Sequence, residues 1–194
     1  SDIARGAGIR IVGPNCMGYL NPRAGLVASF TSLIDQHPVR EAGISLVSQS
    51  GAFGSHCLAI LRERGLPLEM WATTGNQCDV DVCDFISYLV EVPETRAIAC
   101  LFEGMKDGER LLEAGEKALA ADKPVVVYKM ANSASAAAAA MSHTGSLAGT
   151  DAAYRAAFAK TGIVAVENLE AVFETGSFLA KAGRPKANGV AVVA

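Results

Sequence analysis

Residues 44–64 have the sequence ISLVSQSGAFGSHCLAILRER, in which an apolar, β-branched run turns through Gln49, Ser50 and Gly51 into a segment with helical spacing. The run Ile44–Ser48 predicts a strand, and the apolar residues at intervals of three and four that follow it predict a helix. A strand that leads directly into a helix is the repeating unit of a parallel α/β sheet.

The same unit recurs along the chain. Short runs, most of them continuously apolar, predict further strands at Ile9–Val12, Met70–Thr73, Ile98–Phe102, Val125–Lys129, Ile163–Val166 and Val190–Val193. Helical spacing predicts helices at Ala52–Arg64, Asp81–Val90, Asp107–Ala121, Asp151–Lys160 and Leu169–Ala180. Because continuous apolar strands are buried on both faces, we expect an α/β fold with a mostly parallel sheet and helices on both sides.

Composition excludes several classes of protein. The chain has 194 residues with 51% hydrophobic content, enough for a substantial core, and a formal net charge of −3. Without a cluster of Lys and Arg, neither nucleic acid nor an anionic membrane is an expected partner. The apolar runs are too short to cross a bilayer and no basic-then-apolar leader opens the sequence, so we expect a soluble, cytoplasmic protein.

The cysteines and histidines do not have the spacing of a metal site. Five cysteines are scattered without a CxxC pair, and three histidines are scattered without an HxxxH pair. We therefore expect reduced thiols and no structural metal.

Three segments that follow predicted strands carry candidate chemistry, because ligands of open parallel sheets bind outside the carboxyl ends of the strands. The first is Ser50, Gly51 and Ala52, a small-residue turn at the start of a helix. Backbone N–H groups at such a start attract phosphate. An ordinary turn with Ser50 as the helix cap is the alternative.

The second segment is Glu103-Gly104, directly after the predicted strand Ile98–Phe102. A carboxylate at this edge is able to orient an imidazole. The alternative is that Glu103 caps the helix that begins near Asp107.

The third segment is Ser142-His143-Thr144-Gly145, near the end of the stretch 130–148, which has neither helical nor strand periodicity. Connections of this length in a compact α/β unit are usually functional or mobile. A histidine held by a carboxylate accepts a phosphoryl group, whereas a loop histidine with only local hydrogen bonds is the alternative. Together, the three segments predict a phosphohistidine site.

The chain resembles the α-subunit of succinyl-CoA synthetase and, more closely, the ADP-forming acetate–CoA ligases and related NDP-forming acyl-CoA synthetases. The resemblance covers nearly the whole chain, and its most specific motif is Ser142-His143-Thr144-Gly145-Ser146-Leu147-Ala148-Gly149. The other motifs that carry it are Gly13-Pro14-Asn15-Cys16-Met17-Gly18, Val47-Ser48-Gln49-Ser50-Gly51, Gly75-Asn76 with Asp79 and Asp81, Glu103-Gly104, and Lys123-Pro124-Val125.

The resemblance implies three regions. Residues 1–38 would be the end of a CoA-binding Rossmann domain, residues 39–182 a flavodoxin-like, doubly wound phosphohistidine domain, and residues 183–194 a linker and the start of a following domain. The predicted strand at Ile9–Val12 has no preceding partner and Val190–Val193 starts an element at the last residues, so we expect the sequence to be a piece of a longer polypeptide.

The resemblance also implies an acid–thiol ligase that interconverts acyl-CoA, ADP and phosphate with a carboxylic acid, CoA and ATP. His143 would carry the phosphoryl group and Glu103 would orient it; Ser50, Gly51 and Ala52 would bind phosphate, and Asn15 and Cys16 would lie near the thioester of CoA. ATP or ADP with Mg would bind mainly to an ATP-grasp module or β-subunit outside this chain, and the chain alone would be inactive. The rival interpretation is a degenerate acyl-CoA- or nucleotide-sensing module in a larger protein such as an acetyltransferase fusion.

Overall fold

A seven-stranded sheet in the order β2-β1-β4-β3-β5-β6-β7 organises the computed structural model, which describes residues 2–34, 43–130, 150–185, 187 and 189. Strands β3 to β7 are parallel, whereas β1 is antiparallel to both β2 and β4. The strands are β1 (Gly18–Asn21), β2 (Leu26–Ser29), β3 (Gly43–Ser48), β4 (Leu68–Thr73), β5 (Thr95–Phe102), β6 (Val125–Lys129) and β7 (Val164–Val166).

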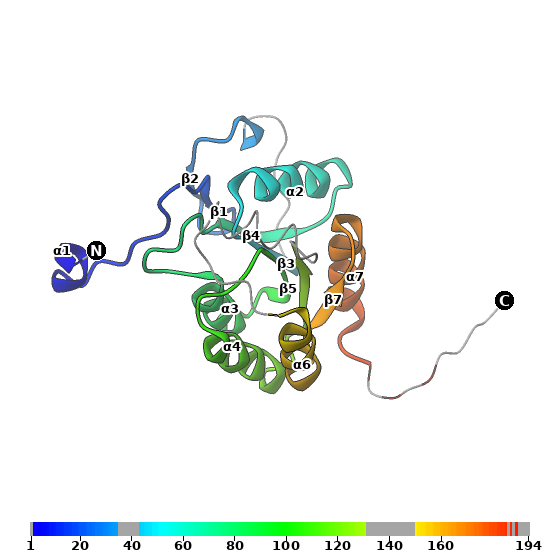
Figure 1. Cartoon of the computed structure of the whole chain (residues 1–194). Coiled ribbons are helices and arrows are strands. Elements are labelled where there is room, and N and C mark those ends of the chain that lie inside the picture. Colours follow the sequence, from blue (N-terminus) through cyan, green and yellow to red (C-terminus); the bar gives the residue numbers. More distant parts are fainter. Residues whose placement is uncertain (1, 35–42, 131–149, 186, 188, 190–194) are drawn as a thin grey trace.

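Helices cover both faces of the sheet, as the sequence predicts (Figure 1). Residues of α3, α4 and α6 belong to one apolar cluster and residues of α2 and α7 to another, with the sheet between them. The described helices are α1 (Asp2–Gly6), the 3-10 helix η1 (Ser32–Ile34), α2 (Gly51–Glu63), α3 (Val82–Glu91), α4 (Gly108–Ala120), α6 (Asp151–Thr161) and α7 (Leu169–Ala182).

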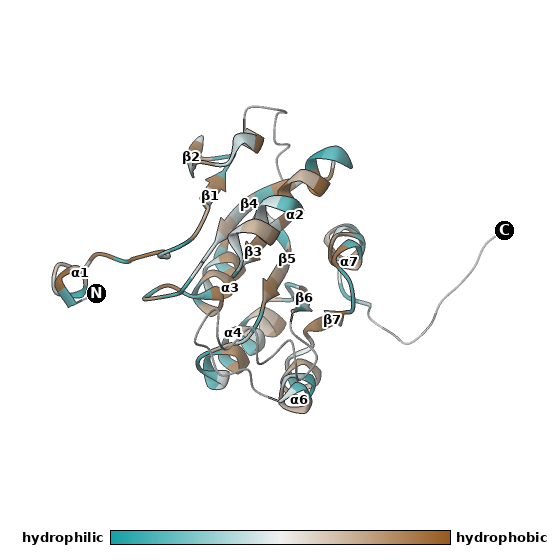
Figure 2. Ribbon diagram, turned by 45° about the horizontal axis from the view of Figure 1, so that its top comes forward, coloured by the Kyte–Doolittle hydropathy of each residue, from teal (hydrophilic) through white to brown (hydrophobic). Residues whose placement is uncertain are grey.

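The parallel strands β3 to β7, here called the parallel platform, hold most of the core. Every residue of β3 and β4 is buried, and Figure 2 shows hydrophobic colouring along the central strands. Trp71 of β4 is fully buried and donates its indole N–H to the Gly54 carbonyl of α2 over 2.8 Å. Burying a large apolar side chain contributes about 1.5–3 kcal/mol, so the platform supplies most of the stabilisation.

Helix boundaries follow the predicted signals. Thr150 and Asn168 cap α6 and α7 by accepting the N–H groups of Ala153 and Ala171. Gly162 ends α6 in the left-handed conformation that favours glycine. The predicted strand at 190–193 lies outside the described residues.

The predicted strand Ile9–Val12 is wrong. Within it the structure has a single parallel bridge, between Val12 and Val80. The Asp79 carboxylate accepts the Ile11 N–H over 2.8 Å. In a strand this N–H would donate to the carbonyl of a neighbouring strand instead. The segment is extended but runs beside a loop rather than beside a strand.

The hairpin of β1 and β2 is absent from the sequence-based prediction. Each strand has only four residues, and they pair from Gly18–Ser29 to Asn21–Leu26. The turn is closed by Asn21 Oδ1, which accepts the Ala24 N–H over 3.0 Å. Together with the preceding extended segment, the hairpin and η1 form a unit that we call the N-terminal arm (residues 10–34).

Candidate functional site

The order of the parallel strands reverses between β3 and β5. From β3 the chain crosses through α2 to β4 on one side, and from β5 it crosses through α4 to β6 on the other. The loops that leave such neighbouring strands in opposite directions open a crevice at the carboxyl edge of the sheet, where α/β proteins bind ligands. Ser50 follows β3 and Glu103 follows β5, so both candidate segments lie at this position.

One cavity of about 290 Å³ brings together all the predicted site residues that the structure describes. His143 lies outside the described residues. The lining residues come from the N-terminal arm and from three loops of the parallel platform: Asn15, Cys16, Met17, Phe30, Gln49, Ser50, Gly51, Ala52, Gly75, Asn76 and Glu103.

Ser50 caps the helix that opens onto the cavity. Its side-chain oxygen accepts the Phe53 N–H over 3.3 Å, and its carbonyl accepts the Gly54 N–H over 2.9 Å. The N–H groups of Gly51 and Ala52 are left without a carbonyl partner inside the helix. Ser50 is thus the ordinary cap of the alternative interpretation, and the cap leaves two donors at the cavity wall.

The start of α2 also differs in charge from the other long helices. The first turns of α3, α4, α6 and α7 contain Asp84, Glu109, Asp151 and Glu170, whereas the first turn of α2 contains no acidic residue. The positive end of the helix dipole is therefore not neutralised by a side chain of its own helix. This arrangement favours an anion at the cavity.

Glu103 does not cap the helix that follows it. Asp107 performs that role by accepting the Glu109 N–H over 2.9 Å. The Glu103 Oε2 atom is buried and has no hydrogen-bond partner within the described part of the chain. A carboxylate oxygen in this state at a cavity wall is suited to accept a hydrogen bond from a ligand or from another side chain.

The N-terminal arm forms the opposite wall. The Asn76 N–H donates to the Pro14 carbonyl over 2.9 Å, and the Asn15 amide donates to Asn76 Oδ1 over 3.4 Å. Gly75 has φ +57°, and a Cβ atom there would lie 2.2 Å from the Pro14 carbonyl oxygen. Glycine is therefore required for the arm to approach the platform this closely.

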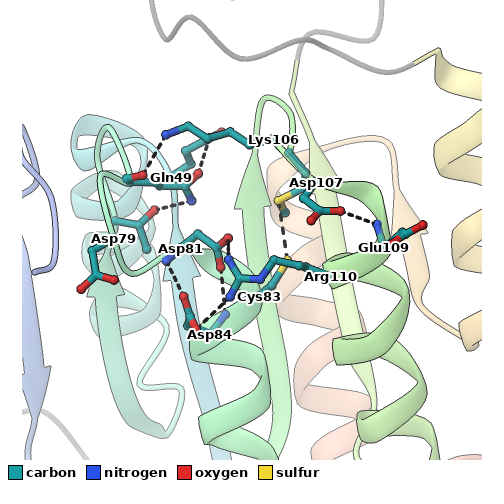
Figure 3. Close-up of polar contacts among 12 residues, drawn as sticks. Gln49, Asp79, Asp81, Cys83, Asp84, Lys106, Asp107, Glu109 and Arg110 are labelled. Atoms are coloured by element: carbon teal, nitrogen blue, oxygen red, sulfur yellow. Dashed lines mark hydrogen bonds and ion pairs between the residues drawn. The ribbon is translucent and has the colours of Figure 1, made fainter. Parts of the chain in front are cut away.

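Gln49 contacts both loops that flank the cavity floor and was not among the predicted site residues. Gln49 (labelled in Figure 3) is 5% exposed, and its side chain bonds the backbone at Glu103 and Gly104 as well as the Gln77 side chain. Phe30 and Met17 were also missed, because both come from the hairpin region. For Gln49 the signal was its position inside the motif that contains Ser50.

Beside the cavity, a group of ion pairs ties α3, α4 and the arm together (Figure 3). Arg110 binds both Asp81 and Asp84, and Asp81 and Asp84 form the capping box of α3. Arg10 binds Asp79 over 3.0 Å. Asp79 and Asp81, which belong to a motif of the resemblance, thus hold the scaffold instead of lining the cavity.

The pKa values of Asp79 and Asp81 in this region are shifted in opposite directions. The hydrogen bond from the Arg10 guanidinium, aided by the Ile11 N–H, lowers the pKa of Asp79. Burial raises the pKa of Asp81 despite the nearby Arg110. Within the ranges that the structure describes, no three His, Cys, Asp or Glu residues are grouped to hold a metal ion. No helix among the described residues is long and apolar enough to cross a membrane.

Comparison with known families identifies the family to which most of the chain belongs. The family described as "Succinyl-CoA ligase like flavodoxin domain" matches residues 41–179. The chain is 34% identical over 192 residues to the ADP-forming acetate–CoA ligase II subunit alpha of Pyrococcus furiosus, covering 99% of this chain and 40% of that protein. It is 36% identical over 180 residues to the ADP-forming acetate–CoA ligase I of Archaeoglobus fulgidus, covering 93% of this chain and 26% of that protein.

A solved structure has the same fold. The dinucleotide-forming acetyl-coenzyme A synthetase 1 of Ca. Korarchaeum cryptofilum, in complex with phosphate and ADP, superposes with a TM-score of 0.85 at 29% identity. The match covers 95% of this chain and 39% of that one. The chain therefore spans between about a quarter and two fifths of the length of these relatives.

Proposed function

This chain belongs to the family of NDP-forming acyl-CoA synthetases, and we propose that it is the phosphohistidine-carrying region of such an enzyme. The observation that supports the proposal most strongly is the shared cavity of the α2 start and Glu103. The cavity is lined both by N–H donors for a phosphoryl group and by a carboxylate acceptor for an imidazole N–H. Phosphoryl transfer to a histidine requires both in one place.

The proposed reaction has three steps. A phosphate oxygen attacks the thioester carbonyl of acyl-CoA, the C–S bond breaks, and CoA leaves as the acyl phosphate forms. An imidazole nitrogen of His143 then attacks phosphorus, the bond to the acyl oxygen breaks, and the carboxylate leaves. Finally, a terminal oxygen of ADP attacks the phosphohistidine, the P–N bond breaks, and ATP forms.

The residues of this chain have separate roles in that sequence. Glu103 accepts a hydrogen bond from the second ring nitrogen of His143 and stabilises the charged ring. The N–H groups of Gly51 and Ala52, at the turn capped by Ser50, bind the phosphoryl oxygens. Asn15 and Cys16, on the opposite wall, lie near the thioester of CoA.

The proposal also assigns the parts that this chain does not provide. An ATP-grasp module or β-subunit binds ATP or ADP with Mg, and a CoA-binding Rossmann domain, of which residues 1–38 are the end, binds most of CoA. Residues 39–182 form the phosphohistidine domain, and residues 183–194 lead to a further domain. A cytoplasmic location of the enzyme, where CoA and ATP are available, is part of the proposal.

Phosphorylation of the complete protein tests the proposal. Incubation with Mg-ATP should give an acid-labile, base-stable phosphate that His143→Ala abolishes. His56→Ala, which removes an exposed histidine of α2, is the matched control and should label normally. Label that persists in His143→Ala would contradict the proposal.

A second outcome separates the two candidate functions. If the complete protein binds acyl-CoA but takes no label from Mg-ATP, a regulatory sensing module replaces the ligase. The Glu103 oxygen, which has no hydrogen-bond partner among the described residues, favours the ligase, because a sensor does not need a carboxylate held ready for an imidazole.

A further inference from the structure

The Gln49 side chain joins three loops at the carboxyl edge of the sheet. Its Oε1 atom accepts the Glu103 N–H over 2.7 Å and the Gly104 N–H over 3.5 Å. Its Nε2 atom donates to the Gly104 carbonyl and to Gln77 Oε1, each over 3.1 Å. A glutamine amide has two acceptor and two donor positions, so all four are used.

The partners also fix which way the amide faces. Two N–H groups on one side require an oxygen, and a carbonyl oxygen on the other side requires the NH₂ group. The Gln49 backbone adds two contacts, because its N–H donates to the Leu101 carbonyl over 2.8 Å and its carbonyl accepts the Gly75 N–H over 3.1 Å. Gln49 therefore has a single orientation, set by the surrounding backbone.

Three of the four side-chain hydrogen bonds of Gln49 are made to the backbone of Glu103 and Gly104: two hold the N–H groups of the peptides that flank Glu103, and the third holds the Gly104 carbonyl. The next residues of the same loop are held as well: Met105 N–H donates to the Tyr154 hydroxyl over 2.8 Å, and Lys106 donates to the Gln77 carbonyl over 2.8 Å (Figure 3). The backbone of Glu103 is thereby fixed, while its Oε2 atom is left without a partner in the described part of the chain.

We infer that Gln49 is a positioning residue that presents the Glu103 carboxylate to the phosphoryl-accepting imidazole. This inference rests on the proposed function. Burying a polar amide among apolar strands costs free energy unless every group is paired, and a buried amide whose bonds converge on one residue holds that residue in place. Catalytic groups misplaced by about 1 Å lose up to roughly 100-fold in rate, so the support of Glu103 is expected to be visible in kinetics.

The first test measures the contact itself in the 194-residue chain. Gln49→Met keeps a long side chain but removes both acceptor and donors, so hydrogen exchange of the Glu103 amide, followed by NMR, should accelerate at least tenfold. Amides in the middle of β5, such as Ala99, should keep their protection. Unchanged exchange at Glu103 would overturn the inference.

The second test measures the rate of histidine phosphorylation in the complete protein. Gln49→Met should lower kcat tenfold or more with KM for Mg-ATP within about twofold, because the Gln49 side chain acts through Glu103 and Mg-ATP is proposed to bind to a module outside this chain. In a Glu103→Gln background the same change should lower the rate by less than about twofold, because Gln49 acts through the group already removed. Equal losses in both backgrounds would mean a general structural role and would overturn the inference.

Thr95→Val is the matched control. Ser45 and Thr95 form a fully buried hydroxyl pair of 2.8 Å on β3 and β5, the same strands, at the opposite end of the sheet. Loss of this hydroxyl pair should lower the free energy of unfolding and leave the phosphorylation rate within about twofold of the wild-type rate. If Gln49→Met does not fold, Gln49→Glu replaces it in the kinetic test: it keeps the volume and the acceptor for the Glu103 N–H, but sets an oxygen against the Gly104 carbonyl.

The proposed function and the role of Gln49 are contradicted by different results. If the wild-type protein takes up no phosphate label from Mg-ATP, the proposed function is wrong, and this inference is wrong with it. Labelled wild-type protein with an unaffected Gln49→Met variant would overturn the inference alone.

Discussion

The parallel platform and the N-terminal arm build opposite walls of the same cavity by different physical means. In the platform, β3 and β4 are buried at every position, and the strands are held by apolar burial. In the arm, β2 has no fully buried residue, and polar side chains attach the segment at its turn and at its start. The platform wall, proposed to be catalytic, is therefore expected to be the stable part, and the arm wall, proposed to face CoA, the adjustable part.

Truncation of a platform residue should have the largest effect. Ile98→Ala, at a fully buried position of β5, is expected to lower the free energy of unfolding by about 2–5 kcal/mol, because it leaves a cavity between the two helical layers. Val27→Ala, at a β2 position that is 55% exposed, should change it by less than about 0.5 kcal/mol. Urea denaturation of both variants measures the two changes in the free energy of unfolding. Equal changes would contradict the expected difference between the platform and the arm.

Removal of an arm anchor should have a smaller and local effect. Arg23 donates two hydrogen bonds of 3.0 Å to Glu69, whose side chain is 2% exposed on β4. Arg23→Ala leaves this carboxylate buried without its guanidinium, at a cost of about 1–3 kcal/mol. Hydrogen exchange should accelerate at Leu20 and not at Ile98.

Arg23→Lys is the control for that anchor, because it keeps the charge and loses the two-pronged geometry. Arg23→Lys should lower the free energy of unfolding by less than Arg23→Ala does. Acceleration of exchange at Ile98 equal to that at Leu20 would show that the arm and the platform unfold as one unit.

Acid should weaken the attachment at the start of the arm. The Arg10 hydrogen bond lowers the pKa of Asp79 in the folded chain below its value in the detached segment, about 3.9. The contact therefore stabilises the arm above about pH 4 and is lost as the pH falls through the lower, folded-state pKa. An NMR titration of the Ile11 amide should report this release, and Asp79→Asn should remove the pH dependence; an identical titration in Asp79→Asn would contradict the assignment.

Thiol reactivity should distinguish the edge of the cavity from the core beneath it. Cys78, in the loop after β4, is exposed and Cys16 is partly exposed at the cavity, whereas Cys57 of α2 and Cys100 of β5 are buried. Burial raises the pKa of the Cys57 thiol to about 12, so it holds almost no thiolate at neutral pH. Mass spectrometry of the native chain after alkylation should find adducts on Cys78 and Cys16, and modification of Cys57 at a similar rate would contradict the burial.

The same division explains which parts of the fold the sequence predicts. The five platform strands have apolar runs, and all five predictions are confirmed; in β3 to β6 burial on both faces leaves a clear pattern, whereas β7 is an exposed edge strand recognised by its β-branched run. The arm strands have four residues each and one exposed face, so only the turn chemistry of Asn21 and Gly25 marks them. Ile9–Val12 has the composition of a strand, but the Asp79 side chain takes its N–H.

The site was predictable to the extent that it follows strand ends. Ser50 and Glu103 are adjacent to platform strands, and the structure brings both to one cavity with Asn15 and Cys16. The role of Gln49 was not predictable, because its partners at Glu103 and Gly104 lie more than fifty positions away and the pairing depends on the register of β3 and β5. The role of His143 stays a prediction.

The central claim is that the start of α2 binds a phosphoryl group in the same cavity that the Glu103 carboxylate lines, and an NMR titration of the chain with inorganic phosphate tests it most directly. The amides of Gly51, Ala52 and Glu103 should shift together and saturate with one Kd, while the first-turn amides of α7 stay in place as an internal control. Equal shifts at the starts of α2 and α7, or no shift at Gly51 and Ala52, would contradict the account.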